Sequence, residues 1–80
     1  MAKTQILSPL PGTFYRRPAP DKPPYKEVGD SVSAGDIIGL VEVMKTFYEV
    51  KAEGAGKITQ FHIENEEAIQ AGQPIADMES

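Results

Sequence analysis

The chain has 80 residues, carries 8 basic and 12 acidic side chains for a net charge of −4, and contains no cysteine. This length allows one small domain at most, the acidity argues against a nucleic-acid binder, which normally presents a basic patch, and the lack of cysteine excludes disulfides and thiolate metal sites. A single histidine leaves little for a nucleophile and base pair or for a metal centre, so we expect neither a self-sufficient enzyme nor a metal site.

Short apolar segments, rich in β-branched and aromatic residues, lie between seven glycines and seven prolines. Such frequent interruptions leave no room for long helices and predict an all-β fold. Residues 64–70 have an acidic start that could open a helix, but Gly72 and Pro74 would end it within two turns, so a strand edge or a turn is favoured there. The expected strands, in chain order, are Thr4–Ser8, Thr13–Arg16, Tyr25–Val28, Asp36–Glu42, Thr46–Ala52, Lys57–Ile63, Ala68–Gln70 and Pro74–Met78.

The sequence repeats itself weakly at two offsets. At an offset of 37, an apolar residue followed by Ala-Gly and a strand occurs twice, starting from Val32 and from Ile69; at an offset of 44, residues 6–14 align with residues 50–58. The offsets differ by seven residues, which must be extra between Phe14 and Val28. Two similar halves, each of about four short strands, predict a pseudo-symmetric barrel or sandwich around one core. Five glycines are interpreted as turn residues with positive φ: Gly12, Gly29, Gly35, Gly56 and Gly72.

The segment from Glu42 to Glu49 joins the two halves, and an antiparallel connection there would be a tight hairpin. It contains no Gly, Asn, Asp or Pro, the residues usual in such turns. Its apolar residues cannot all point inward from a hairpin, so some apolar surface should be exposed beside Lys45. We expect a docking site there, because a turn without turn residues is a local inconsistency of the kind that often marks function.

The seven extra residues belong to a proline-rich stretch, Arg16–Pro24, which holds four of the seven prolines. Proline fixes the backbone and lacks an amide donor, so this stretch should protrude as a stiff loop and not pair in a sheet. The result would be a semi-rigid finger with two arginines at its base.

Four motifs resemble the biotinyl domain of biotin carboxyl carrier proteins, most closely the type found in multisubunit acetyl-CoA carboxylase. Residues 8–16 are similar to the family's Ser-Pro-Met-x-Gly-Thr-Phe-Tyr-Arg, and residues 18–21 to the Pro-Ser-Pro-Asp of the protruding thumb that marks this type. Residues 28–36 are similar to Val-Gly-x-x-Val-x-x-Gly-Asp, and residues 42–46 to the core motif Glu-Ala-Met-Lys-Met, whose lysine carries biotin. The motifs occur in the right order, and the resemblance spans about residues 5–79.

This resemblance implies a single biotinyl domain over residues 1–80: a flattened β-barrel, or barrel-sandwich hybrid, of two pseudo-symmetric four-stranded halves, with a thumb loop at about residues 16–24 and an acceptor hairpin at residues 43–46. It further implies that a biotin protein ligase attaches biotin covalently to Lys45. The biotin would then carry carboxyl groups from a biotin carboxylase to a carboxyltransferase, in acetyl-CoA carboxylase and hence in fatty acid biosynthesis. Such a chain is a non-catalytic carrier with no nucleic-acid partner.

No apolar run approaches the roughly 20 residues of a membrane span, and the N-terminus lacks the apolar stretch of a signal peptide. We therefore expect no membrane partner and a cytoplasmic protein, or one of a plastid or other organelle stroma if a full precursor carried a transit peptide.

The resemblance assigns Val43, Met44 and Thr46 as the flanks of the acceptor Lys45, and Val43 and Thr46 depart from the family's Ala and Met. Met44 argues against a lipoyl domain, which typically has Asp before its lysine. In the thumb, Arg17 stands where this type has a Thr close to the biotin ureido ring; with Pro18 it is a candidate biotin contact, since Arg can donate hydrogen bonds to a ureido oxygen. Three alternatives stay open: a carrier of another biotin-dependent carboxylase, a lipoyl carrier, and an unmodified barrel-sandwich hybrid structural domain.

Overall fold

The protein is all-β, as predicted, in a computed structural model that describes residues 3–80. Residues 1–2, which the single-domain interpretation also includes, lie outside the described residues. The described chain contains no helix, and residues 64–70 form a turn and a short strand, as favoured above. The eight strands are β1 (Lys3–Leu7), β2 (Gly12–Tyr15), β3 (Ser31–Val32), β4 (Ile37–Val43), β5 (Thr46–Lys51), β6 (Gly56–Phe61), β7 (Glu67–Ile69) and β8 (Pro74–Glu79).

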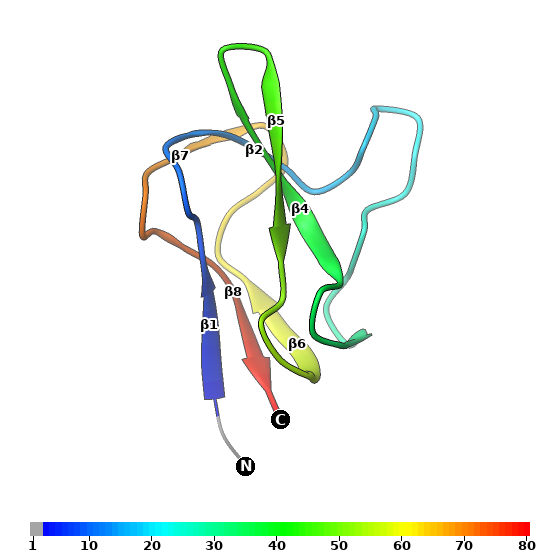
Figure 1. Cartoon of the computed structure of the whole chain (residues 1–80). Coiled ribbons are helices and arrows are strands. Elements are labelled where there is room, and N and C mark those ends of the chain that lie inside the picture. Colours follow the sequence, from blue (N-terminus) through cyan, green and yellow to red (C-terminus); the bar gives the residue numbers. More distant parts are fainter. Residues whose placement is uncertain (1–2) are drawn as a thin grey trace.

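The strands form two four-stranded antiparallel sheets, with strand orders β1-β8-β6-β3 and β5-β4-β2-β7. Each sheet takes two strands from the first half of the chain and two from the second, so the halves interleave (Figure 1). Within residues 3–80 no strand pairing joins one sheet to the other, so the predicted barrel-sandwich hybrid has the form of a sandwich whose sheets meet through their side chains. The molecule is flattened accordingly, with extents of 38 × 27 × 19 Å.

The sequence repeat is a structural pseudo-symmetry between the two halves. Gly35 and Gly72, which align at the offset of 37, have φ values of 91° and 81°. The Gly35 amide donates to the carbonyl oxygen of Ala52 and the Gly72 amide to that of Ser8, each over 2.8 Å. Ala52 and Ser8 are themselves aligned at the offset of 44, so both offsets describe one symmetry.

The core lies between the sheets and is built from the inward positions of the strands, which alternate with exposed positions as the two-residue period of a strand requires. Phe14, Ile38, Ile58 and Ile75 are fully buried there, and the repeat pairs Phe14 with Ile58 and Ile38 with Ile75. The other buried apolar residues are Ile6, Val32, Val41, Val50, Ala52, Ile63, Ile69, Ala76 and Met78.

The strand predicted at Tyr25–Val28 is wrong: residues 25–27 have no regular structure, residues 27–30 form a turn, and β3 begins only at Ser31. The Asp30 amide donates to the carbonyl oxygen of Glu27 over 3.0 Å, while the Asp30 carboxylate accepts from the Glu27 amide over 2.9 Å. Gly29 takes a φ of 98°, which is outside the strand region. A short polar side chain that hydrogen-bonds its own backbone competes with strand pairing, and here the Asp30 turn prevails.

The prediction of positive φ holds for Gly29, Gly35 and Gly72 and is wrong for Gly12 and Gly56, which lie inside strands. Those two glycines serve close packing instead. A Cβ added to Gly56 would lie 2.7 Å from the Glu79 carbonyl oxygen, and one added to Gly12 would collide with the equivalent oxygen of Glu42. Glycine at these positions lets β6 approach β8 and β2 approach β4.

Candidate functional site

Lys45 lies at the tip of the hairpin formed by β4 and β5, which projects beyond the rest of the sandwich (Figure 1). Val43 pairs with Thr46, leaving Met44 and Lys45 as the two turn residues. Both have positive φ, 49° and 67°, as a type I′ turn requires. Residues with a Cβ pay about 1–2 kcal/mol each for this left-handed conformation. The chain thus presents Lys45 on a turn that its own residues do not favour.

The residues around Lys45 are mostly exposed. Met44 is 93% exposed, Phe47 is 55% exposed and Tyr48 is 45% exposed. Lys45 and Thr46 are also exposed, whereas Val43 is half-buried and packs against the core. The expected apolar surface beside Lys45 is therefore confirmed. Val43 differs from the other flanks because its side chain packs against the core at the strand pair next to the turn.

Tyr15 braces the same hairpin from the neighbouring strand β2. Its hydroxyl donates to the Glu42 carboxylate over 2.9 Å, and its ring packs against that of Phe47 with centroids 6.0 Å apart. The hydrogen bond to Glu42 is the main cause that raises the pKa of Tyr15 above its ordinary value, with partial burial and the charges of Glu42 and Glu66 adding to it. Tyr15 thereby contacts both strands of the hairpin.

The proline-rich stretch, residues 16–24, contains no strand and extends away from the sandwich (Figure 1). It leaves after β2 and returns beside its own start, where the Tyr25 amide donates to the Arg16 carbonyl oxygen over 2.9 Å. A turn closes its far end, with the Lys22 amide donating to the Ala19 carbonyl oxygen over 3.0 Å. We call residues 16–24 the thumb.

A cleft of about 550 Å³ lies between the thumb and the hairpin. Phe47, two residues after Lys45, belongs to its wall, so the cleft begins about 7 Å of extended chain away from Lys45. Arg17 lines it as well, and its Nε is a buried donor with no hydrogen-bond partner among residues 3–80. The complete lining is Tyr15, Arg17, Pro18, Ala19, Pro20, Phe47, Asn65 and Glu66.

The structure brings both groups of sequence-assigned residues to one end of the molecule, with Lys45 and its flanks on the hairpin and Arg17 and Pro18 on the thumb. Phe47 belongs to the segment where the sequence predicts a docking site, whereas sequence reasoning did not assign Tyr15, Asn65 or Glu66 to the site. Tyr15 directly precedes the two arginines at the base of the predicted loop, and this position could have indicated that it lies near the site. Asn65 and Glu66 arrive from the loop before β7 through long-range folding, and nothing local marks them.

This arrangement can be compared with known proteins. The sequence profile of the family described as "Biotin-requiring enzyme" matches residues 4–78, which is nearly the whole chain. The chain belongs to this family.

Relatives of this chain include two bacterial proteins, each named "Biotin carboxyl carrier protein of acetyl-CoA carboxylase". The one from Nostoc sp. is 35% identical over 71 residues, covering 89% of this chain and 39% of that protein. The one from Chlamydia pneumoniae is 44% identical over 70 residues, covering 88% of this chain and 42% of that protein. The chain thus spans less than half the length of these relatives.

Solved structures agree on the fold. The Kluyveromyces lactis urea carboxylase matches with a TM-score of 0.78 and 29% identity, over 98% of this chain and 6% of that one. A single-chain, multi-domain long-chain acyl-CoA carboxylase matches with a TM-score of 0.80 and 17% identity, over 95% of this chain and 7% of that one, and shows the fold alone.

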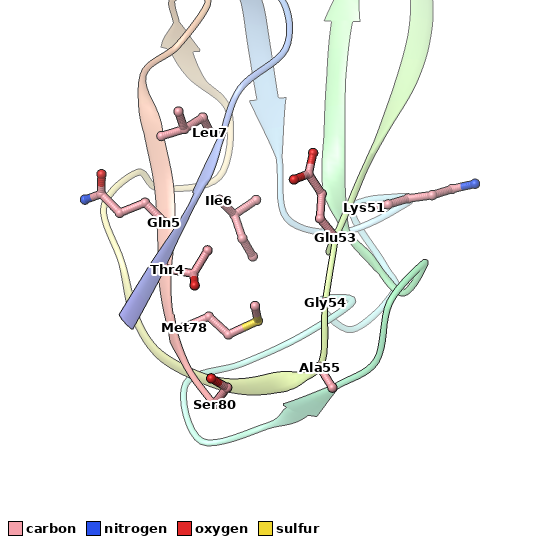
Figure 2. A pocket seen from close by; sticks show the side chains of 10 residues that line it. All are labelled: Thr4, Gln5, Ile6, Leu7, Lys51, Glu53, Gly54, Ala55, Met78 and Ser80. Carbon is pink, nitrogen blue, oxygen red and sulfur yellow. The ribbon is translucent and has the colours of Figure 1, made fainter. Parts of the chain in front are cut away.

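A second cleft, of about 470 Å³, lies at the other end of the sandwich, with Thr4 and Ser80 in its lining (Figure 2). Ile6 and Met78 point into it between β1 and the turn at residues 53–55, and the Lys51 side chain points away. Lys51 lies five positions after Thr46 along β5, a span of about 17 Å. This cleft is therefore remote from the acceptor hairpin.

His62 pairs with Asp77 away from the hairpin, with 2.9 Å between Nε2 and Oδ1. That contact is the main cause that lowers the pKa of Asp77 below its ordinary value. Within residues 3–80 no cluster of three or more His, Asp or Glu side chains is placed to hold a metal ion. The described part of the chain likewise offers no helix with the length and apolarity that a bilayer crossing needs.

Proposed function

We propose that this domain is a biotin carboxyl carrier whose Lys45 bears biotin through an amide bond. The observation that carries the proposal is the exposed Met44-Lys45 pair at the tip of the strained hairpin turn, in a chain of the biotin-requiring enzyme family. Relatives named as carrier proteins of acetyl-CoA carboxylase support the same assignment. We infer that the domain serves an acetyl-CoA carboxylase in fatty acid biosynthesis.

Attachment requires an accessible amine and a partner that activates the acid. A proton acceptor first takes one proton from the Lys45 ammonium, and the neutral Nζ then attacks the activated carboxyl carbon of biotin. The activating group leaves with the bonding electrons, and the nitrogen loses a second proton, so that a neutral amide with one N–H replaces the ammonium. The domain itself supplies the exposed nitrogen. A biotin protein ligase supplies the activated acid and the proton acceptor, and it is the first partner that we propose.

The cofactor, once attached, supplies the carboxyl-accepting nitrogen, and the domain supplies its transport. A flexible arm on a fixed hairpin keeps the group at high effective concentration near two enzymes, a biotin carboxylase and a carboxyltransferase. The domain is thus a carrier and not the catalyst. We assign it to the cytoplasm of a bacterium or to a plastid stroma, since its curated relatives include bacterial and chloroplastic proteins.

The thumb cleft fits a bicyclic ureido ring. Its lining offers the apolar faces of Pro18 and Phe47, together with the unpartnered Nε of Arg17, a donor that a ureido carbonyl oxygen would satisfy. We propose that Arg17 and Pro18 contact biotin there. In the biotinylated protein, Arg17→Ala should change the NMR shifts of the biotin ring, whereas Lys22→Ala, on the exposed far end of the thumb, should leave them in place. Unchanged biotin shifts in Arg17→Ala would refute this contact.

Intact mass after co-expression with a biotin ligase tests the main proposal. We expect one biotin adduct on the wild-type chain, none on Lys45→Arg, and an undiminished adduct on the matched control Lys57→Arg, which changes an exposed lysine on β6. An adduct that survives Lys45→Arg, or no adduct on the wild type, would overturn the proposal.

The same measurement separates the alternatives. A lipoyl carrier would gain a lipoyl mass from a lipoate ligase and no biotin mass. An unmodified structural domain would gain neither. Met44 and the thumb favour the biotin assignment, and binding of the biotinylated chain to the subunits of acetyl-CoA carboxylase, compared with those of another biotin-dependent carboxylase, would identify the complex.

A further inference from the structure

We propose that Arg16 is a positioning residue that fixes the thumb beside the acceptor hairpin. The inference rests on the proposed function, because a fixed thumb matters for a group carried on Lys45. Arg16 is the first residue after β2, at the root of the thumb, and it is half-buried. Arg17, its neighbour, lines the cleft instead, so the two arginines have different roles.

Arg16 contacts four residues in three separate parts of the chain. Its guanidinium carbon lies 4.1 Å from the centroid of the Phe61 ring, and its Nη2 donates to the Lys26 carbonyl oxygen over 3.1 Å. Its backbone amide donates to the Asn65 side-chain oxygen over 2.8 Å, and its carbonyl oxygen accepts from the Tyr25 amide over 2.9 Å. One residue thus joins the outgoing and returning ends of the thumb to β6 and to the loop before β7.

Phe61 makes this anchor firm because it is half-buried at the end of β6 and packs against the core. A guanidinium over an aromatic face gains more when both groups are partly withdrawn from water. The Nε of Arg16 is buried and has no partner among residues 3–80, so the side-chain contribution comes from the stacking and from Nη2. Lysine cannot reproduce both, since it lacks the planar fork.

The rest of the thumb has little else to hold it. Its four prolines, Pro18, Pro20, Pro23 and Pro24, have no amide hydrogen and cannot donate to the sandwich. Residues 17–24 make a single backbone-to-backbone hydrogen bond, in which the Lys22 amide donates to the Ala19 carbonyl oxygen within the thumb itself. Proline makes the thumb stiff but does not fix its direction. The direction is set at the root, where Arg16 lies.

The cleft depends on this direction because its two walls have different origins. Tyr15 and Phe47 belong to the sandwich and hold each other in place. Residues 17–20 form the opposite wall and move with the thumb. If the root loosens, the second wall swings away from the first, while the hairpin that presents Lys45 stays as it is.

The test compares wild type, Arg16→Ala, Arg16→Lys and Arg17→Ala by NMR, in both the unmodified and the biotinylated protein. In Arg16→Ala we expect the Tyr25 amide, which reports on the thumb root, to exchange with solvent at least about tenfold faster, and contacts between the biotin ring and Pro18 to disappear. Amides of β4 and β8 should keep their protection, and Lys45 should still be biotinylated. Arg16→Lys should restore the biotin contacts in part, because it keeps a cation over Phe61.

Arg17→Ala is the matched control, since it removes a neighbouring guanidinium but leaves the root intact. It should leave Tyr25 exchange unchanged. The proposal is overturned if Arg16→Ala keeps wild-type exchange at Tyr25, or if Arg17→Ala accelerates it equally. If Arg16→Ala does not fold, wild-type exchange in Arg16→Lys overturns the proposal and faster exchange supports it. If no biotin is ever attached, the proposed function fails separately, and exchange in the unmodified protein still decides the role of Arg16.

Discussion

The acceptor turn should be less stable with its own residues than with glycine. Met44 has a φ of 49° and a side chain that is 93% exposed, so Met44→Gly removes left-handed strain while losing almost no buried area. The strain is about 1–2 kcal/mol for a residue with a Cβ, and the extra freedom of glycine in the unfolded chain costs about 0.5–1 kcal/mol. We expect a net stabilisation of about 0.5–1 kcal/mol, which raises the midpoint of thermal unfolding by roughly 2–8 °C in a domain of this size.

Thermal and urea unfolding of the unmodified domain measure this effect. Thr46→Gly is the matched control, because Thr46 is also exposed but lies in β5 and not at a positive-φ turn position; glycine there should destabilise by about 0.5–1 kcal/mol. The reasoning is refuted if Met44→Gly unfolds at or below the wild-type midpoint. Biotinylation of Met44→Gly, followed by mass in parallel, should slow down, because the ligase loses the most exposed apolar side chain beside the acceptor.

Three further predictions concern the scaffold. Ile58→Ala, at a fully buried core position, should cost about 2–5 kcal/mol in urea unfolding; a cost under about 1 kcal/mol would contradict the assigned core. Gly56→Ala should lower the unfolding midpoint, because the new Cβ would lie 2.7 Å from the Glu79 carbonyl oxygen, whereas Gly54→Ala, whose Cβ would meet nothing within 4 Å, should not. The pKa of Asp77 is lowered in the folded state, chiefly by its hydrogen bond with His62; its contribution is therefore present above the unfolded pKa and lost as pH falls below about 4. Asp77→Asn should flatten the acid limb of the stability profile, and an unchanged limb would exclude this group.

Much of the scaffold could be predicted from the sequence, because the repeat consists of turn glycines and apolar strand positions whose structural roles depend on nearby residues. Gly35 and Gly72 take the same backbone conformation and make the same hydrogen bond, and the aligned apolar positions are the buried ones. The hairpin at Lys45 follows from the same pattern. The interleaving of the two halves between the sheets did not follow, because it depends on which strands pair across long stretches of chain.

The wrong predictions have physical causes that the sequence pattern did not reveal. Residues 25–28 have the composition of a strand, but the Asp30 side chain folds back on the backbone and delays pairing until Ser31. Gly12 and Gly56 looked like turn residues, yet they are required by close packing between strands. For the site, the sequence predicts Lys45 as the acceptor, and the structure has this residue exposed in the turn of the hairpin. The different positions of Arg16 and Arg17 could not be predicted from the sequence. Only the folded structure places the Arg16 guanidinium over Phe61 and Arg17 in the lining of the cleft.

The pseudo-symmetry assigns a counterpart to the hairpin itself. Strands β8 and β1 correspond to β4 and β5, and they pair antiparallel with Lys3 opposite Glu79, at the end of the molecule far from Lys45 (Figure 1). The paired ends of β1 and β8, at Lys3 and Glu79, therefore lie where the pseudo-symmetry places a second hairpin, but no turn connects these two strands. A circular permutant that joins them through a two-residue turn and opens the chain at the tip of the thumb would keep every strand intact. With Met-Lys placed in that new turn, biotinylation of the new lysine would show whether the turn alone is sufficient for recognition by a ligase. Absence of biotinylation there would indicate that the neighbouring thumb is needed.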